Sequence, residues 1–198
     1  PLLRSPLTEY LAERGIPYAV ASRHCCRLNY GVRGKRYFAI GFQNVVGGYE
    51  IRSRYFKGCV PPKDVSLVKM ESSPTGVCSL FEGFMDFLSA ATLGLETGDS
   101  LVLNSVSNVA RAIRYLNDRH LTHIRAFLDN DDAGKRATND FIRAGFKVED
   151  MSVHYRNFKD LNEYHVHRVR EQLKRQSLKM PQTQTNPIKV KQVKHKMR

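Results

Sequence analysis

The sequence predicts an α/β fold, in which a mostly parallel sheet with flanking helices follows a small basic α+β module. From Val77 onward, short apolar segments alternate with helix-length segments, which is typical of parallel βαβ units. The charge balance changes in the same region. Residues 1–70 contain 12 basic and 4 acidic residues, whereas residues 71–167 contain 10 and 14. We therefore predict a basic α+β module over 1–70, an α/β domain over 77–167 and a basic, largely disordered tail over 168–198.

The first module is expected to begin with a helix, because Ser5 is a good N-cap and Pro6 suits the first helical turn. The apolar spacing of this helix ends at Gly15. Aromatic and β-branched residues then predict a β-hairpin, with turn residues at 44–48. Pro61 and Pro62 end the module. The predicted elements are helices over 7–14 and 20–25 and strands over 37–42 and 49–55.

The second module should hold ligands beyond the carboxyl ends of its parallel strands, as such sheets generally do. A linker rich in Ser, Pro and Gly is predicted over 72–76. After His167 a helix could continue over 168–180, and the polar, Lys-rich end beyond it is expected to be disordered. The predicted strands are 77–81, 101–103, 124–128 and 146–153, and the predicted helices are 83–93, 109–116 and 133–144.

Composition limits the classes of function. The formal net charge of +13 is concentrated in the first module and the tail, which favours binding to polyanions. No apolar run approaches the roughly 20 residues of a membrane span, and no signal pattern opens the chain, so we expect a cytoplasmic protein with no membrane partner. The four cysteines lack metal-ligand spacing. The start at Pro1 indicates a piece of a longer protein.

Acidic residues follow two of the predicted strands. Glu82 follows the first strand, Asp129 and Asp131 follow the third, and Asp86 lies one helical turn beyond Glu82. Clustered carboxylates suit Mg²⁺ or Mn²⁺, which can polarise a phosphoryl group, and Glu82 could act as a general base. Taken alone, the stretch Asp-Asn-Asp-Asp-Ala-Gly could be an ordinary helix cap, but its pairing with Glu82 at a second strand end favours the metal site.

These motifs resemble the TOPRIM domain. FEGFMDFLSA, from Phe81, is similar to the bacterial primase form of its first motif, and LDNDDAGKRA, from Leu128, is similar to its DxDxAG motif. The resemblance covers residues 77–167 and implies that Glu82 is the catalytic acid/base. It also implies that Asp129 and Asp131 bind metal, with Asp86 as the second acid of the first motif. In the third segment, KDLNE, Asp160 fits the first acid and is, with Asp86, a further candidate metal ligand. Asn162 stands where a second acid is usual, and the adjacent Glu163 could take that role.

Residues 1–70 resemble the module that precedes TOPRIM in bacterial primases, through YLAERGI and through GKRYFAIGFQNVVGGYEIRSRYFKG followed by PPKD. More specifically, the chain resembles short primase-like proteins of Bacteroides-type mobile elements, which carry an amino-terminal zinc ribbon. That ribbon is missing here, so zinc is expected only in the missing part. The resemblance implies primer synthesis in the bacterial cytoplasm, with single-stranded DNA, NTPs and a replicative or mobile-element helicase as partners.

Basic residues after the predicted hairpin are candidates for binding phosphates of template or nucleotides. Arg52 and Arg54 would point the same way on a strand, and Lys57 and Lys63 follow them. The alternative is a solvated edge strand blunted by charge. The polar loop 104–108 could bind phosphate or cap a helix.

Other residues that could stack on bases or bind a metal are predicted to have neither role. Tyr37 and Phe38 are predicted to be core residues, and His154, His165 and His167 are predicted to be surface residues without a metal.

Three functions fit these residues: a metal-dependent primase, a TOPRIM-type nuclease that uses the same ions with water as nucleophile, and a non-catalytic DNA-binding protein of a mobile element. The intact acids at Glu82, Asp129 and Asp131 favour an enzyme, and the primase resemblance favours nucleotidyl transfer.

Overall fold

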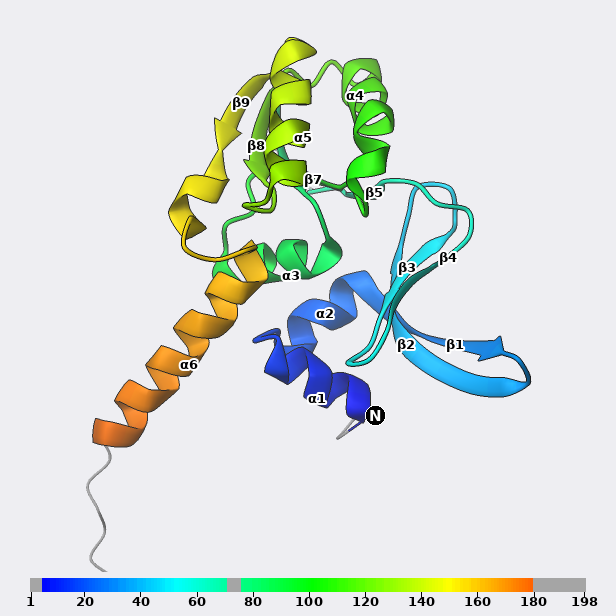
Figure 1. Cartoon of the computed structure of the whole chain (residues 1–198), viewed down its shortest axis with the longest axis vertical. Helices are drawn as coiled ribbons and strands as arrows, with labels where there is room; N and C mark the ends of the chain where they lie inside the picture. The colour runs from blue at the N-terminus through cyan, green and yellow to red at the C-terminus, as the bar shows by residue number, and fades with distance from the viewer. Residues whose placement is uncertain (1–4, 71–75, 180–198) are drawn as a thin grey trace, which may run out of the picture.

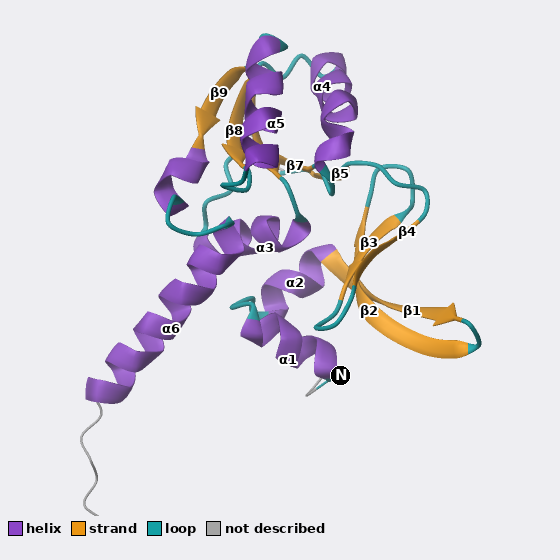
Figure 2. Cartoon of the chain, in the orientation of Figure 1, coloured by secondary structure: helices purple, strands orange, loops and turns teal. Residues whose placement is uncertain are grey.

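A computed structural model describes residues 5–70 and 76–179 (Figure 1). They form two sheets, one of four strands and one of five, with helices packed between and around them (Figure 2). The α/β prediction is confirmed. Within the described residues, no helix is long and apolar enough to cross a membrane.

The first sheet is antiparallel, with its strands in chain order. It follows two helices, and Ser5 caps the first of them through a reciprocal hydrogen-bond pair with Thr8, as the sequence indicated. Its first and last strands were not predicted, because their polar and small residues do not alternate clearly. The elements are α1 (Pro6–Glu13), α2 (Tyr18–His24), β1 (Cys25–Val32), β2 (Lys35–Gln43), β3 (Tyr49–Arg52) and β4 (Lys57–Val60).

The second sheet has the order β5-β7-β6-β8-β9, in which β5 runs antiparallel and the other strands are parallel. It contains the predicted strand–helix alternation. Its elements are β5 (Ser66–Val68), β6 (Val77–Phe81), α3 (Phe84–Leu93), β7 (Asp99–Val102), α4 (Val109–Asp118), β8 (His123–Phe127), α5 (Asp132–Arg143) and β9 (Lys147–Asp150). The helix α6 (Leu161–Lys179) follows and projects from the body of the protein (Figure 1).

The structure differs from the sequence prediction at several element boundaries. Strand β3 ends at Arg52 rather than residue 55. Ser66–Val68 lies inside the predicted first module but pairs with the second sheet. The last strand ends at Asp150 rather than residue 153, because Met151 turns into the core and begins a 3-10 helix, Met151–Tyr155. Residues 168–179 continue α6, as the possible helix extension over 168–180 indicated, so the first part of the tail predicted over 168–198 is helical. Residues 72–75 of the predicted linker, and the tail from residue 180, lie outside the described residues.

Alternation along the strands divides the core into two layers. Leu80, Leu101 and Ile124 point to one face of the second sheet, which α4 and α5 cover. Phe81 and Val102 point to the opposite face, where α3 packs. The same cluster continues through α3 to α1, α2 and β2, so the first module packs on the second sheet by way of α3.

Candidate metal centre

Two carboxylates meet where neighbouring parallel strands end. Strands β6 and β8 pair in register up to Phe81 and Phe127, so Glu82 and Asp129 emerge at the same edge of the sheet. Burial raises the pKa of Glu82, an effect opposed by a backbone hydrogen bond from Asp129 and increased by the charge of Asp131. One oxygen of Glu82, Oε2, is buried without a hydrogen-bond partner. A buried, unsatisfied carboxylate oxygen is costly unless a ligand satisfies it.

Asp129 lies in the same electrostatic environment. Burial, together with the charges of Glu82 and Asp160, raises its pKa to about 7. Lys159 partly opposes this effect, with its Nζ 3.8 Å from Asp129 Oδ2. At neutral pH a cation at this edge would therefore relieve repulsion among at least three carboxylates.

Asp131 caps α5 through one of its two carboxylate oxygens. Its Oδ1 accepts hydrogen bonds from the backbone N–H groups of Ala133 (2.9 Å) and Gly134 (3.0 Å), so it caps α5, as the alternative interpretation held. Within the described part of the chain, no hydrogen bond engages its second oxygen. Gly134 allows the first turn of α5 to lie against the backbone of Asp129, since a Cβ at residue 134 would lie 2.1 Å from the carbonyl oxygen of Asp129.

Asp86 and Asp160 hold the start of α6. Asp86 Oδ1 accepts from the backbone N–H of Asn162 at 3.0 Å, and Asp160 Oδ1 accepts from that of Glu163 at 2.7 Å. Asp86 is 7% exposed, and burial followed by the charges of Asp160 and Asp129 raises its pKa well above the ordinary value. Both carboxylates thus belong to the acidic cluster, and each has one oxygen engaged by α6.

Asn162, which replaces an acid of the family pattern, is fully buried. Its Nδ2 donates to the carbonyl of Arg14 (2.9 Å) and to Ser89 Oγ (2.8 Å), so it connects α6 to α1 and α3. Glu163 Oε2 accepts from the backbone N–H of Lys159 at 2.6 Å. Asn162 therefore serves the packing of the helices, and Glu163 serves the cap of α6.

The donor set fits a hard divalent cation. No three His, Cys, Asp or Glu side chains, in the part of the chain that the structure describes, already surround one point closely enough to hold an ion. Mg²⁺ commonly binds through one or two carboxylates, several waters and substrate phosphates, so a closed cage is not required. The unpartnered Oε2 of Glu82 and the raised pKa of Asp129 are the features that a cation would satisfy.

Two of the predicted basic residues lie on the face of the first sheet that packs on α3. Arg52 and Lys57 are cross-strand partners in register with Ile40. They share a face with Phe42, which stacks on Phe84 of α3 at 5.2 Å. Their face is thus directed toward the second sheet, and the charge of Lys57 acts to lower the pKa of Glu82.

The other two predicted basic residues lie elsewhere. Strand β3 ends at Arg52, so the alternation argument does not extend to Arg54, which forms an ion pair with Glu13 on α1. The charge of Lys63 acts to lower the pKa of Glu50. The backbone carbonyl of Lys63 accepts a hydrogen bond from the Arg111 guanidinium at 2.5 Å.

Sequence reasoning missed Asn130 and Lys159 at the site. Asn130 donates through Nδ2 to the carbonyls of Tyr155 (3.0 Å) and Phe158 (2.9 Å), and its N–H donates to the carbonyl of Lys159 at 2.7 Å. It fixes the loop after β8 against the segment that carries Lys159. The signal for Asn130 was its position between Asp129 and Asp131.

Three further expectations concern residues outside the acidic cluster. His165 is buried rather than on the surface, with Nε2 2.8 Å from the carbonyl oxygen of Gly15. In the polar loop, Asn104 and Asn108 use their amides to hold the fold, which favours the structural alternative. Tyr37 and Phe38 are exposed rather than core, because the β1–β2 hairpin extends beyond the helices.

The comparisons with known proteins agree with this geometry. A family model described as Toprim-like matches residues 79–165, and one described as a domain of unknown function (DUF8464) matches residues 1–61. The comparison with curated proteins finds no match.

Solved structures share the fold. The primase fragment of the bacteriophage T7 primase-helicase protein matches with a TM-score of 0.59 and 18% identity, over 87% of this chain and 73% of that one. A structure of the T7 lagging-strand DNA polymerase interacting with primase domains, bound to an RNA/DNA hybrid and dTTP, matches with a TM-score of 0.54 and 15% identity, over 84% and 88%. Residues 79–165 are therefore similar to a Toprim-like family, and the chain is similar in fold to a T7 primase fragment.

Proposed function

We propose that this chain is the catalytic core of a metal-dependent DNA primase, which synthesises an RNA primer on single-stranded DNA. The observation that carries the proposal is the buried, unpartnered oxygen of Glu82 beside Asp129, at the carboxyl ends of two parallel strands and within reach of the Lys57 charge. The likeness in fold to a T7 primase fragment supports the same reading. Single-stranded DNA and NTPs are the proposed substrates, and a helicase partner stays a prediction.

In the proposed reaction, the 3′-hydroxyl oxygen of the growing primer forms a bond to the α-phosphorus of an NTP. The bond from that phosphorus to the bridging oxygen breaks, and pyrophosphate leaves with the electron pair. Glu82 accepts the proton of the hydroxyl, and its raised pKa suits a base that works near neutral pH. A divalent ion, when bound, would polarise the phosphoryl group and neutralise developing charge.

The other residues prepare the site for polyphosphate. Asp129 and Asp131 would hold the ion, since their oxygens lie at the same strand end. Arg52 and Lys57 would contact template or nucleotide phosphates, because their face of the first sheet is directed toward the acidic cluster. Lys159 neutralises Asp129 in the metal-free protein and could turn to a phosphate when an ion takes its place.

The test incubates the full chain with single-stranded DNA, labelled NTPs and Mg²⁺ or Mn²⁺. Elongated RNA products support the proposal, whereas cleaved DNA indicates the nuclease and unchanged DNA indicates a binding protein. Glu82→Gln should abolish synthesis, by about 100-fold or more, because it keeps the shape and removes the base. Glu96→Gln is the matched control: burial also raises the pKa of Glu96, which precedes β7 at the opposite edge of the sheet. Equal losses in both variants would contradict the assignment of Glu82.

A further inference from the structure

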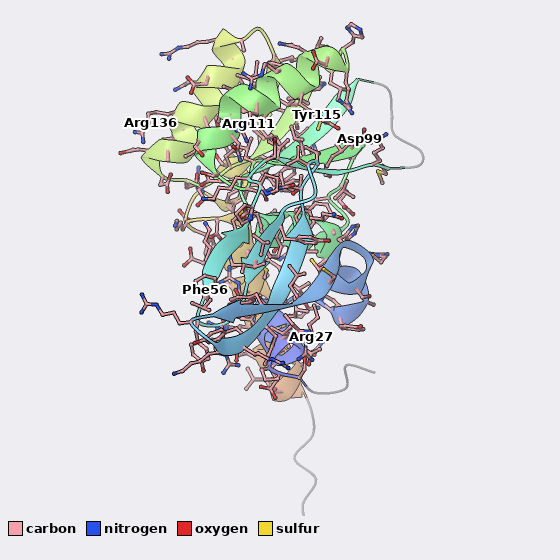
Figure 3. The ribbon with its side chains drawn as sticks, turned by 90° about the vertical axis from the view of Figure 1, so that its right-hand side faces the viewer. Arg27, Phe56, Asp99, Arg111, Tyr115 and Arg136 are labelled. Carbon is pink, nitrogen blue, oxygen red and sulfur yellow. The ribbon has the colours of Figure 1, made fainter. Side chains whose placement is uncertain are left out.

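Exposed aromatic side chains surround a groove in the first module, away from the acidic cluster. The groove has a volume of about 660 Å³ and lies between α1, the β1–β2 hairpin and the β3–β4 turn. Tyr55 is 89% exposed, Phe56 47% and Tyr37 43%. Figure 3 shows Phe56 and Arg27 on this module, apart from Arg111 and Arg136 on the second-sheet helices. The aromatic lining residues, named here the aromatic groove, are Tyr30, Tyr37, Phe38, Tyr55 and Phe56.

We infer that the aromatic groove binds single-stranded DNA by stacking its unpaired bases. This inference rests on the proposed function, for which it supplies the means of holding the template. Every base has a flat π-face, so stacking on aromatic side chains is tolerant of sequence.

The rings are already arranged for stacking. Tyr30 and Tyr37 are cross-strand partners with ring centroids 5.7 Å apart and an interplanar angle of 25°. Tyr30 and Phe56 are 6.1 Å apart at 29°. On the other face of the hairpin, the guanidinium of Arg27 lies 4.7 Å from the centroid of Phe38. Near-parallel rings at the surface offer open faces on which bases can continue the stack.

The charge of the hairpin matches a phosphodiester backbone. Residues 25–48 contain four basic residues and no acidic residue. Arg36 and Arg54 line the groove, and Glu9 on α1 is the one carboxylate among the described lining residues. A large apolar surface with a cationic rim thus fits a ligand that combines flat apolar rings with anions.

The groove lies beside the turn that leads to the basic face of the first sheet. Phe56 is followed by Lys57, the residue whose charge acts on Glu82. Phe56 lies against Gly58, which alternates with Lys57 along β4, so the stacked rings and the Lys57 side chain are on opposite faces of the sheet. Duplex DNA fits less well, because its bases are already stacked on each other.

The experiment compares binding of the full chain to three labelled ligands in EDTA, by fluorescence anisotropy. They are an oligothymidylate of about 12 nucleotides, an abasic strand of equal length and charge, and the duplex. Wild type should bind the base-bearing strand at least about five-fold tighter than the abasic strand. Tyr37→Leu with Tyr55→Leu should remove this preference, while Tyr37→Phe with Tyr55→Phe should retain it. Tyr18→Leu is the matched control, as Tyr18 is 49% exposed on α2 outside the aromatic groove.

Several results would overturn the inference: equal binding of base-bearing and abasic strands by wild type, an unchanged preference in the double Leu variant, or a duplex bound as tightly as the base-bearing strand. A wild-type dimer that the double Leu variant converts to monomer would instead assign the groove to contact between copies. Because the assay contains no metal, it is independent of catalysis. A base preference without primer synthesis would defeat the proposed function alone, and primer synthesis with no base preference would defeat the groove alone.

Discussion

Replacing Asp129 by Asn should stabilise the metal-free protein at alkaline pH. Burial and the charges of Glu82 and Asp160 raise the pKa of Asp129 from 3.8 to about 7. At about 1.36 kcal/mol per pH unit, this difference corresponds to about 4 kcal/mol. Solvent screening and loss of the ion pair with Lys159 reduce the expected gain to about 1–2 kcal/mol. For a chain of this size that gain raises the Tm by about 2–8 °C.

The size of the stabilisation by Asp129→Asn depends on pH. Because the folded-state pKa is raised, the folded protein keeps a proton that the unfolded chain has lost, and the stability contributed by this group falls as the pH rises from about 4 through 7. The gain from Asp129→Asn should therefore be full above pH 8 and well under half as large at pH 5. Thermal melts of both proteins in EDTA at these two pH values measure it.

Metal addition should reverse the order. Mn²⁺ should raise the Tm of wild type at pH 8 and raise that of Asp129→Asn much less, because the Asn amide carries no charge. Asp140→Asn, an exposed change on α5, serves as the control. A variant that is less stable than wild type at pH 8 in EDTA, or one with an undiminished response to Mn²⁺, would refute the reasoning.

Three further predictions follow from the contacts. Gly134→Ala should destabilise the protein by about 1–3 kcal/mol and weaken its stabilisation by Mn²⁺, because the added Cβ would displace the Asp129 backbone. Chemical denaturation with and without the ion measures both effects. Asn162→Asp should destabilise the protein by about 3 kcal/mol at pH 8 and less at pH 5. The substitution places a carboxylate beside buried Asp86 and removes two donated hydrogen bonds. Thermal melts that show the same loss of stability at both pH values would contradict this reasoning. Deleting residues 181–198, which contain five basic and no acidic residues, should weaken binding to single-stranded DNA. The plot of log affinity against log salt should become less steep by about 0.7 for each lost phosphate contact. An unchanged slope in binding isotherms at several salt concentrations would exclude a role for the tail.

The sequence alone determined the class of fold and the position of the acidic edge. Apolar strand-length segments alternating with helices from Val77 can bury their surfaces only as a layered α/β sheet, and the structure confirms this fold. Because β6 and β8 are parallel neighbours, Glu82 and Asp129 had to emerge at one edge. The capping pattern at Ser5 was also local and therefore readable.

Tertiary structure alone decided which atoms of these residues are engaged. One oxygen of Asp86 is held by the N–H of Asn162, 76 positions away, and Arg54 turns to Glu13, 41 positions away. Tyr37 and Phe38 are aromatic residues of a kind that is usual in a core, but they are exposed because no other element covers the end of their hairpin. Local sequence fixes periodicity and capping, whereas burial and hydrogen-bond partners depend on segments that only folding brings together.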